Sequence, residues 1–340
     1  MSILVTGGLG YIGSHTTVEL LEAGYDVVVV DNLYNCKESV KNNIYKITGK
    51  NFKFYKYDLT NRQHCEKVFE ENSIDAVIHF CAYKAVGESV ERPLKYYDNN
   101  IKSTLVLLGE MNKYNVKKLV FSSSACVYGD SNKMPVKEED KLLTTNPYGR
   151  TKLMIEDMLR DLYKSDNSWN ISILRYFNPI GAHESGIIGE ESNDIPNNLM
   201  PYITKVALGE LKELSVFGND YNTLDGSGVR DYIHVVDLAK GHIKALEKLR
   251  EECGLVTYNL GTGKGVSVLE LVNIFSKVNN IEVPYKIVGR RKGDVAECYA
   301  DVTKANKELD WKATKTIEDM CRDSYKWGVK NKHMELLIKT

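Results

Sequence analysis

Short hydrophobic runs alternate with amphipathic stretches through the first half of the chain. The apolar runs are typical of buried strands and lie at residues 3–6, 26–30, 52–57, 76–80, 119–123 and 171–174. Between most of them, and again at 94–113 and 147–163, apolar residues recur with the spacing of a helix. Because strands that are apolar on both faces need covering on both, the pattern predicts a parallel sheet with helices on each side, a doubly wound α/β fold.

The pattern loses its regularity after about residue 175. Residues 176–230 and 264–300 are rich in Gly, Asn, Pro and Asp, and they predict loops with only short helices such as 199–209. We therefore expect the second half to add a smaller lobe rather than to repeat the first architecture.

One part of the second half returns to the earlier pattern. Residues 231–249 predict a helix and 257–260 a strand, so we expect 231–262 to rejoin the main sheet. The prediction is a first domain over 1–175 and a second lobe over 176–340.

Composition excludes several classes of function. The 340 residues are 43% hydrophobic and 27% charged, with a formal net charge of -1, which gives no attraction to nucleic acid or to an anionic membrane. Seven scattered cysteines without a C-x-x-C pair, and seven histidines without H-E-x-x-H, predict no disulfide framework, no metal site and a reducing compartment. There is no signal peptide pattern and no apolar run of roughly 18 residues, so we expect a cytoplasmic protein without a membrane span.

A glycine-rich turn follows the first predicted strand. Gly7, Gly10 and Gly13 form a G-x-x-G-x-x-G pattern that opens the first predicted helix, where glycines let the backbone approach a pyrophosphate. Asp31 ends the second strand, where a carboxylate accepts from ribose hydroxyls and repels a 2′-phosphate. Asp31 is also compatible with the role of a turn residue beside Asn32. Together these residues predict a Rossmann-type domain that binds NAD rather than NADP.

Further candidate contacts follow the next two strands. Asp58 and Leu59 end the third strand, Phe80 and Lys84 follow the fourth, and Asn99 lies in a helix downstream. Ligands of open α/β sheets bind at the carboxyl ends of the strands, so these residues are candidates for the cofactor site. Asp58 and Asn99 are each equally compatible with a helix cap or a turn.

Tyr148 and Lys152 lie four positions apart on a predicted helix and therefore share one face. A Lys ammonium favours a neighbouring phenolate, so we expect the pKa of Tyr148 to fall from about 10 toward working pH. Tyr148 then becomes a candidate general base for a hydroxyl proton, with Ser124 bonding the same oxygen. Alone, the pair also fits two amphipathic residues on a helix surface; the glycine turn and Asp31 favour catalysis.

Several segments in one order carry a family resemblance. They include TGGLGYIGSH at 6–15, SSSACVYG at 122–129, NPYGRTK at 146–152, LRYFNPIGAH at 174–183, DGSGVRDYIHVVDLA at 225–239 and RRKGD at 290–294. Over nearly its whole length the chain resembles the extended short-chain dehydrogenase/reductase family, and most closely its NAD-dependent branch that epimerises UDP-sugars. The resemblance implies reversible C4 epimerisation of UDP-glucose and UDP-galactose by a homodimer, through transient hydride transfer to bound NAD and a 4-keto sugar.

The resemblance also implies roles for individual residues. The catalytic set would be Ser124, Tyr148 and Lys152. Besides these and the glycines of the turn, NAD would contact Tyr11, Ile12, Asp31, Asn32, Asp58, Leu59, Phe80, Lys84, Asn99 and Phe177. The UDP-sugar would contact Asn178, Asn198, Leu199, Phe217, Arg230, Arg291, Asp294 and Cys298. The two arginines suit a diphosphate because a guanidinium presents forked donors.

Two cysteines depart from the family pattern. Cys126 lies near Ser124, where many relatives carry Thr, and its thiol removes one hydroxyl from the substrate site. Cys298 occupies a position where some members carry a bulky Tyr, and a smaller side chain leaves space for an acetamido group. We therefore predict UDP-GlcNAc and UDP-GalNAc as additional substrates.

Two other functions share most of these features. A sugar-nucleotide 4,6-dehydratase has the same fold, cofactor and Tyr/Lys pair, but it needs an acid and a base where this chain has Ala125 and Cys126. A non-catalytic NAD-sensing regulator would typically lack Tyr148 or Lys152, and both are present. The sequence favours the epimerase over both alternatives.

Overall fold

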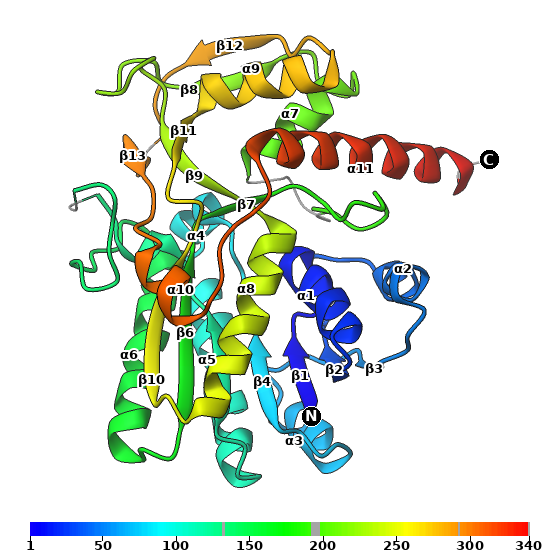
Figure 1. The fold of residues 1–340 in the computed structure, drawn as a ribbon, viewed down its shortest axis with the longest axis vertical. Coiled ribbons are helices and arrows are strands. Elements are labelled where there is room, and N and C mark those ends of the chain that lie inside the picture. The colour runs from blue at the N-terminus through cyan, green and yellow to red at the C-terminus, as the bar shows by residue number, and fades with distance from the viewer. Residues whose placement is uncertain (131–132, 192–197, 292, 339–340) are drawn as a thin grey trace.

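The main body of the molecule is a parallel sheet between two layers of helices (Figure 1). The computed structural model describes residues 1–130, 133–191, 198–291 and 293–338, and within them this sheet has seven strands in the order β10-β6-β5-β4-β1-β2-β3. The strands are β1 (Ser2–Thr6), β2 (Asp26–Val30), β3 (Lys53–Tyr55), β4 (Ala76–His79), β5 (Lys118–Ser122), β6 (Asn170–Tyr176) and β10 (Leu255–Leu260). All neighbouring strands pair in parallel. The predicted doubly wound, Rossmann-type α/β fold is confirmed.

Helices cover both faces of this sheet because its strands are apolar on both. One layer contains α1 (Tyr11–Glu22), α2 (Ser39–Thr48) and α8 (Val235–Lys248), and the other contains α3 (Arg62–Glu70), α5 (Pro93–Lys113) and α6 (Pro147–Ser165). Along β1, Ile3 and Val5 pack in the first layer and Leu4 in the second, as the alternation of side chains along a strand requires. The short helix α4 (Val86–Glu91) leads into α5.

The strand order reverses at β1. The chain leaves β1 for β2 on one side, and later returns to place β4 on the other side, with Thr6 paired to His79. Loops that follow β1 and β4 therefore diverge and leave a crevice at the carboxyl ends of the strands. This crevice is where a ligand of such a sheet binds.

A smaller lobe lies beyond these carboxyl ends (Figure 1). Its strands are β7 (Asn178–Ile180), β8 (Leu214–Phe217), β9 (Val229–His234), β11 (Gly265–Ser267), β12 (Tyr285–Val288) and β13 (Glu297–Cys298). Its helices include α7 (Leu199–Ala207), α9 (Val268–Asn279) and α11 (Ile317–Ile338), while α10 (Thr303–Glu308) contacts β10. Phe275 and Ile203 are buried in its separate hydrophobic core. Of the helices described, none is both long and apolar enough to span a bilayer.

Two predictions of secondary structure in the second half of the chain were wrong. The predicted helix 231–249 begins only at Val235, because residues 229–234 form β9, which pairs with β7, β11 and β13. The segment 264–300, expected to hold loops and short helices, contains the twelve-residue helix α9. Ser267 and Glu270 form a capping box at its start, a local signal from which this helix could have been predicted.

Candidate active site

The turn after β1 presents the start of α1 to the crevice. Gly7 has a φ of 70°, which favours glycine, and the Gly10 carbonyl accepts the first helical bond from Ser14 at 2.8 Å. A Cβ on Gly13 would lie 2.1 Å from the Gly7 carbonyl oxygen, so the helix can approach the turn only without a side chain there. Free N–H groups at the start of a helix of twelve residues form a natural site for a phosphate.

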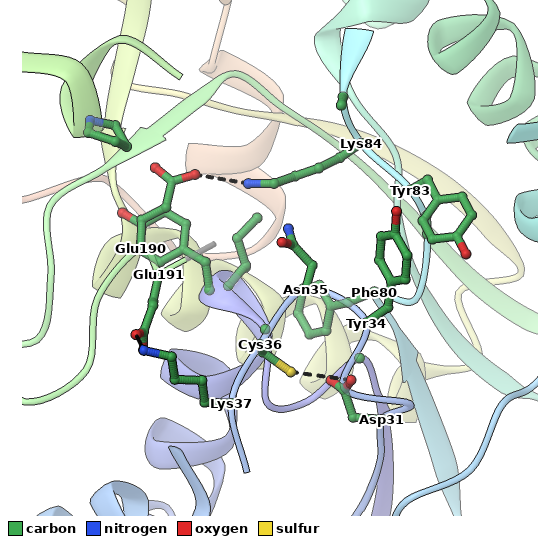
Figure 2. Close-up of a pocket in the computed structure, with 18 of the residues that line it drawn as sticks. Asp31, Tyr34, Asn35, Cys36, Lys37, Phe80, Tyr83, Lys84, Glu190 and Glu191 are labelled. Atoms are coloured by element: carbon green, nitrogen blue, oxygen red, sulfur yellow. Dashed lines mark hydrogen bonds and ion pairs between the residues drawn. The ribbon is translucent and has the colours of Figure 1, made fainter. Parts of the chain in front are cut away.

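Asp31 ties this turn to the end of β2. Its Oδ2 accepts from the Leu9 backbone N–H at 3.1 Å, and its Oδ1 accepts from the Leu33 N–H at 2.9 Å and the Cys36 thiol at 3.4 Å. Burial raises the pKa of Asp31, although these donors act in the opposite direction. The carboxylate is therefore oriented by fixed donors at the wall of the crevice (Figure 2).

A cavity of about 690 Å³ occupies the crevice, a size suited to a small-molecule ligand. It brings together residues that follow β1, β2 and β4 with residues of α5 and α6, which are far apart in the sequence. The predicted residues that line it are Gly7, Gly10, Tyr11, Ile12, Gly13, Asp31, Asn32, Phe80, Lys84, Asn99, Tyr148 and Lys152. The cavity combines a helix N-terminus, a carboxylate at a strand end and a glycine cradle, which are the groups that a dinucleotide requires.

Tyr148 and Lys152 lie one turn apart near the start of α6, and both are almost fully buried. Asn146 caps the helix by accepting from the Gly149 N–H at 2.8 Å. Lys152 donates to the Ser122 carbonyl at 2.7 Å, and its ammonium lies 5.0 Å from the centre of the Phe121 ring. Both side chains thus lie at the cavity wall, where the Ser122 carbonyl holds the Lys152 ammonium.

The pKa of Tyr148 contradicts the expectation from the sequence. Burial raises it well above the ordinary value of 10, and the neighbouring Tyr176 raises it further, while a hydrogen bond with Ser124 lowers it. The prediction of an acidified phenol was wrong because removing the phenolate from water outweighs the nearby bond. Burial also lowers the pKa of Lys152 to about 8, which leaves its ammonium more readily deprotonated than an exposed lysine.

Three predicted cofactor contacts lie outside the lining of the cavity. Asp58 forms a turn in which its Oδ1 accepts from the Thr60 N–H at 2.8 Å and hydroxyl at 2.7 Å, and its Oδ2 accepts from Asn32 Nδ2 at 3.3 Å. Leu59 and Phe177 are buried in two separate hydrophobic clusters. Asp58 therefore orients Asn32, which does line the cavity.

Ser124 also lies just outside this lining, at the carboxyl end of β5. Its hydroxyl accepts from the Cys126 N–H at 3.2 Å and so caps the short 3₁₀ turn Ala125–Val127. The Ser124 side chain is 7% exposed, and hydrogen bonding with it lowers the pKa of Tyr148, so Ser124 lies between the Tyr148 phenol and this turn.

The predicted substrate residues form two groups in the smaller lobe. Arg291 places its guanidinium 4.6 Å from the Phe217 ring centre, and its Nε donates to Asp294 Oδ2 at 3.3 Å. Arg230 lies on β9 directly beside Cys298 of β13 and donates to the Val229 carbonyl at 2.8 Å. None of these residues lines the described part of the 690 Å³ cavity.

The remaining three candidates lie where the lobe approaches the cavity. Asn178 is exposed at the start of β7, and Leu199 begins α7. Asn198 donates from Nδ2 to Glu190 Oε1 at 2.6 Å, and Glu190 lines the cavity. Asn198 is therefore one hydrogen bond away from the lining of the cavity.

Several lining residues were not singled out from the sequence. Among them are Tyr34, Tyr83, Tyr176, Glu190 and Glu191, of which Figure 2 labels all but Tyr176. Tyr34 and Tyr83 follow strand ends that were already assigned to the cofactor, so their positions could have indicated them. Nothing local distinguishes Glu190 and Glu191, because only the folded lobe brings them to the cavity.

Comparison with known proteins identifies close relatives over the whole chain. A family model described as GDP-mannose 4,6 dehydratase matches residues 4–324. The UDP-glucose 4-epimerase of Bacillus subtilis (strain 168) is 59% identical over 331 residues, 97% of this chain and 98% of that protein.

Solved structures agree with this result. The UDP-glucose 4-epimerase of Bifidobacterium longum, in complex with NAD+ and UDP, is 55% identical with a TM-score of 0.95, covering 98% of this chain and 99% of that one. The enzyme of Stenotrophomonas maltophila, with bound NAD and formylated UDP-arabinopyranose, is 49% identical with a TM-score of 0.96 over 98% and 99% of the two chains.

Proposed function

The chain belongs to the UDP-glucose 4-epimerases, a branch of the extended short-chain dehydrogenase/reductase family, and from this we propose that Tyr148 is the base of its reaction. The enzyme uses NAD and epimerises UDP-glucose and UDP-galactose at C4. One observation supports the assignment of the base: the Tyr148 phenol and the Lys152 ammonium lie on adjacent turns of α6, and both line the cavity that begins at the glycine turn.

The residues of the cavity suit NAD. We assign the pyrophosphate to the N–H groups at the start of α1, where the turn leaves no room for a side chain at Gly13. We assign the adenosine ribose to Asp31. Asn32, held by Asp58, and Lys84 extend the same wall. Bound NAD supplies an oxidised nicotinamide that takes a hydride from sugar C4 and returns it to the other face, so that no net oxidation results.

Side chains of the protein, rather than the cofactor, carry out the proton transfer. Tyr148 takes the proton of the 4-hydroxyl and returns it after the 4-keto sugar has turned, and Ser124 bonds the same oxygen. Because burial disfavours the phenolate, a fixed positive charge is needed beside it. Lys152, held by the Ser122 carbonyl, supplies that charge within a water-poor site.

The turning of the sugar requires an anchor elsewhere on the substrate. Arg230 and Arg291 present guanidinium groups in the smaller lobe and would hold the diphosphate, while Phe217 offers an aromatic face beside Arg291. Asn178, Asn198, Leu199 and Asp294 would complete the contacts to the UDP-sugar. With the diphosphate fixed, either face of the keto sugar can be presented to the same catalytic groups.

The position of Cys298 supports the additional N-acetylated substrates. Its side chain is half-buried, lies beside Arg230 and packs against the cluster that contains Phe177. A Tyr at this position would occupy space that a thiol leaves to the sugar. UDP-GlcNAc and UDP-GalNAc are therefore part of the proposal.

This chain lacks the acid and base that a dehydratase needs beside its catalytic serine. The turn that follows Ser124 contains Ala125 and Cys126, neither of which is a carboxyl acid or base, and burial raises the pKa of the Cys126 thiol. A proton donor and acceptor for the loss of water are thus missing from the turn nearest the catalytic serine.

The decisive experiment is the Tyr148→Phe variant. We expect kcat for UDP-galactose to fall by about 100- to 10,000-fold, the range of a lost general base, while the protein keeps its NAD. Anaerobic incubation without added nicotinamide, followed by product analysis, measures this. Tyr45→Phe, on the exposed face of α2, is the matched control and keeps wild-type activity. Undiminished turnover of Tyr148→Phe would overturn the assignment.

We further propose that residues 1–175 bind NAD and 176–340 bind the UDP-sugar, with 231–262 returning to the main sheet. A homodimer is supported by the family and by the exposed side chains of Leu94, Leu105 and Met154 on the adjacent helices α5 and α6. Light scattering of Leu105→Glu, expected to be monomeric, tests the dimer. The seven free cysteines suit work in the cytoplasm.

A further inference from the structure

Glu156 is a fully buried carboxylate on the catalytic helix. It lies one turn beyond Lys152 on α6, on the same face, and has no exposed surface. Its Oε1 accepts from the Ser123 hydroxyl at 2.6 Å, and Ser123 immediately precedes Ser124. A buried carboxylate is costly unless it is paired, so its position one turn from the catalytic lysine requires an explanation.

Arg175 of β6 compensates this charge. Its Nε donates to Glu156 Oε1 at 3.0 Å and its Nη2 to Oε2 at 2.7 Å, and the guanidinium is 1% exposed. Arg160 adds a second donor to Oε2 at 2.7 Å. Burial raises the pKa of Glu156, but these bonds outweigh burial and leave the pKa below its ordinary value. The carboxylate is therefore ionised throughout the working pH range.

The end of β5 is tied to α6 at three successive residues. The Ser122 carbonyl accepts from Lys152, the Ser123 hydroxyl donates to Glu156, and hydrogen bonding with Ser124 lowers the pKa of Tyr148. Each contact uses a different turn of the helix. Of the three, only the contact of Glu156 lies outside the set assigned to the reaction.

The surroundings of Lys152 make the charge of Glu156 significant. Burial is the main cause that lowers the pKa of Lys152 to about 8, while Cys81 beyond β4, Glu156 on α6 and Cys126 in the 3₁₀ turn act in the opposite direction. His79 of β4 faces the same lysine, but burial lowers its pKa to about 3, so it stays neutral. The thiols are neutral as well, because burial raises both of their pKa values. Glu156 is thus the ionised anion among these groups.

We propose that Glu156 is a positioning residue for epimerisation, which keeps Lys152 protonated and holds the Ser123–Ser124 end of β5 against the catalytic helix. The proposal rests on the proposed roles of Tyr148 and Lys152. Glu156 itself touches neither substrate nor cofactor in this scheme. Its effect passes through the charge of Lys152 and the position of Ser124.

The test is Glu156→Gln, which keeps the shape and an acceptor oxygen but removes the charge. With an opposing charge lost nearby, the pKa of Lys152 falls by about one unit, so kcat at pH 8 drops about fivefold. At pH 6 the lysine is protonated in both proteins, and the two rates converge. KM for UDP-galactose stays within about twofold, because no substrate contact is removed. Asp157→Asn, at the next and exposed position of α6, is the control and keeps the wild-type profile.

The pKa of Lys152 is also measured directly by NMR of lysine-labelled protein, with Lys152→Met to assign the signal. A lower pKa of Lys152 in Glu156→Gln than in the wild type supports the proposal independently of turnover. If Glu156→Gln does not fold, the double variant Glu156→Gln/Arg175→Met also removes the unpaired guanidinium. We expect this double variant to show the same lowered pKa of Lys152, since Glu156 rather than Arg175 acts on Lys152.

An unchanged pH profile and an unchanged Lys152 pKa in a folded variant would overturn the proposal. If Tyr148→Phe abolishes turnover while Glu156→Gln behaves as wild type, only the role of Glu156 fails. If Tyr148→Phe remains active, the proposed function itself fails.

Discussion

The ammonium of Lys84 lies 2.9 Å from the carboxylate of Glu190 and joins the main domain to the smaller lobe across the cavity (Figure 2). Asn198 donates to the same carboxylate, and Lys37 pairs with the adjacent Glu191. Both acidic residues lie between β7 and α7 in the chain, and two ion pairs hold them at the cavity, beside the wall assigned to NAD. An enzyme with no net redox change needs to retain its cofactor, and we expect these ion pairs to oppose the escape of NAD.

Glu190→Gln is expected to release NAD faster. Because the lysine is partly exposed, the lost pair is worth about 0.2–1 kcal/mol, which corresponds to an increase of up to about fivefold in the dissociation rate. The NAD that remains bound after timed gel filtration measures the effect. Glu184→Gln, an exposed change on the same segment, serves as the control, and equal NAD retention in both variants contradicts the prediction.

Lys152→Met is expected to change how stability depends on pH. Burial lowers the pKa of Lys152 from 10.5 to about 8, so between these values the unfolded chain holds a proton that the folded chain has lost. The free energy of unfolding of the wild type therefore rises with pH across this window, relative to the variant. From pH 7 to 10.5 the difference moves in favour of the wild type by on the order of 3 kcal/mol. Urea denaturation at a series of pH values measures it, and a difference that does not vary with pH rejects the prediction.

Cys298→Tyr is expected to narrow the range of sugars. A ring beside Arg230 fills the space proposed for the acetamido group, and such overpacking costs about 1–3 kcal/mol. The ratio of kcat/KM for UDP-GalNAc to that for UDP-galactose should fall by roughly tenfold or more. Cys298→Ser, which is close in size to the original, is the control and preserves the ratio. No change of the ratio in Cys298→Tyr removes the argument for the N-acetylated substrates.

Gly13→Ala is expected to disrupt the glycine turn. Its Cβ would lie 2.1 Å from the Gly7 carbonyl oxygen, which is backbone and cannot move aside cheaply. We expect a loss of about 1–3 kcal/mol in the free energy of unfolding, together with loss of bound NAD. Gly87→Ala, in α4 with no heavy atom within 4 Å of the added carbon, is the matched control and gains about 0.5–1 kcal/mol. Thermal unfolding and NAD content compare the two, and equal behaviour would refute the steric argument.

Local sequence patterns were sufficient to predict the sheet, the glycine turn and the position of Asp31. Apolar runs predict strands because each strand must bury its own side chains, whatever lies beyond it. Gly7, Gly10 and Gly13 depend on the backbone of one turn, and Asp31 on the end of one strand. The same reasoning missed α9, although Ser267 and Glu270 carry a local signal, because the apparent loop composition of 264–300 was given more weight.

Properties that depend on burial from many directions were beyond the reach of the sequence. The spacing of Tyr148 and Lys152 indicated their common face correctly, but the predicted direction of the Tyr148 pKa shift was wrong, since that shift depends mainly on how completely the folded protein buries the phenol. Glu190 meets Lys84, and Glu156 meets Arg175, across 106 and 19 positions of the chain. Short-range patterns contain no information on such pairs, because the free energy that brings them together comes from the packing of the whole fold.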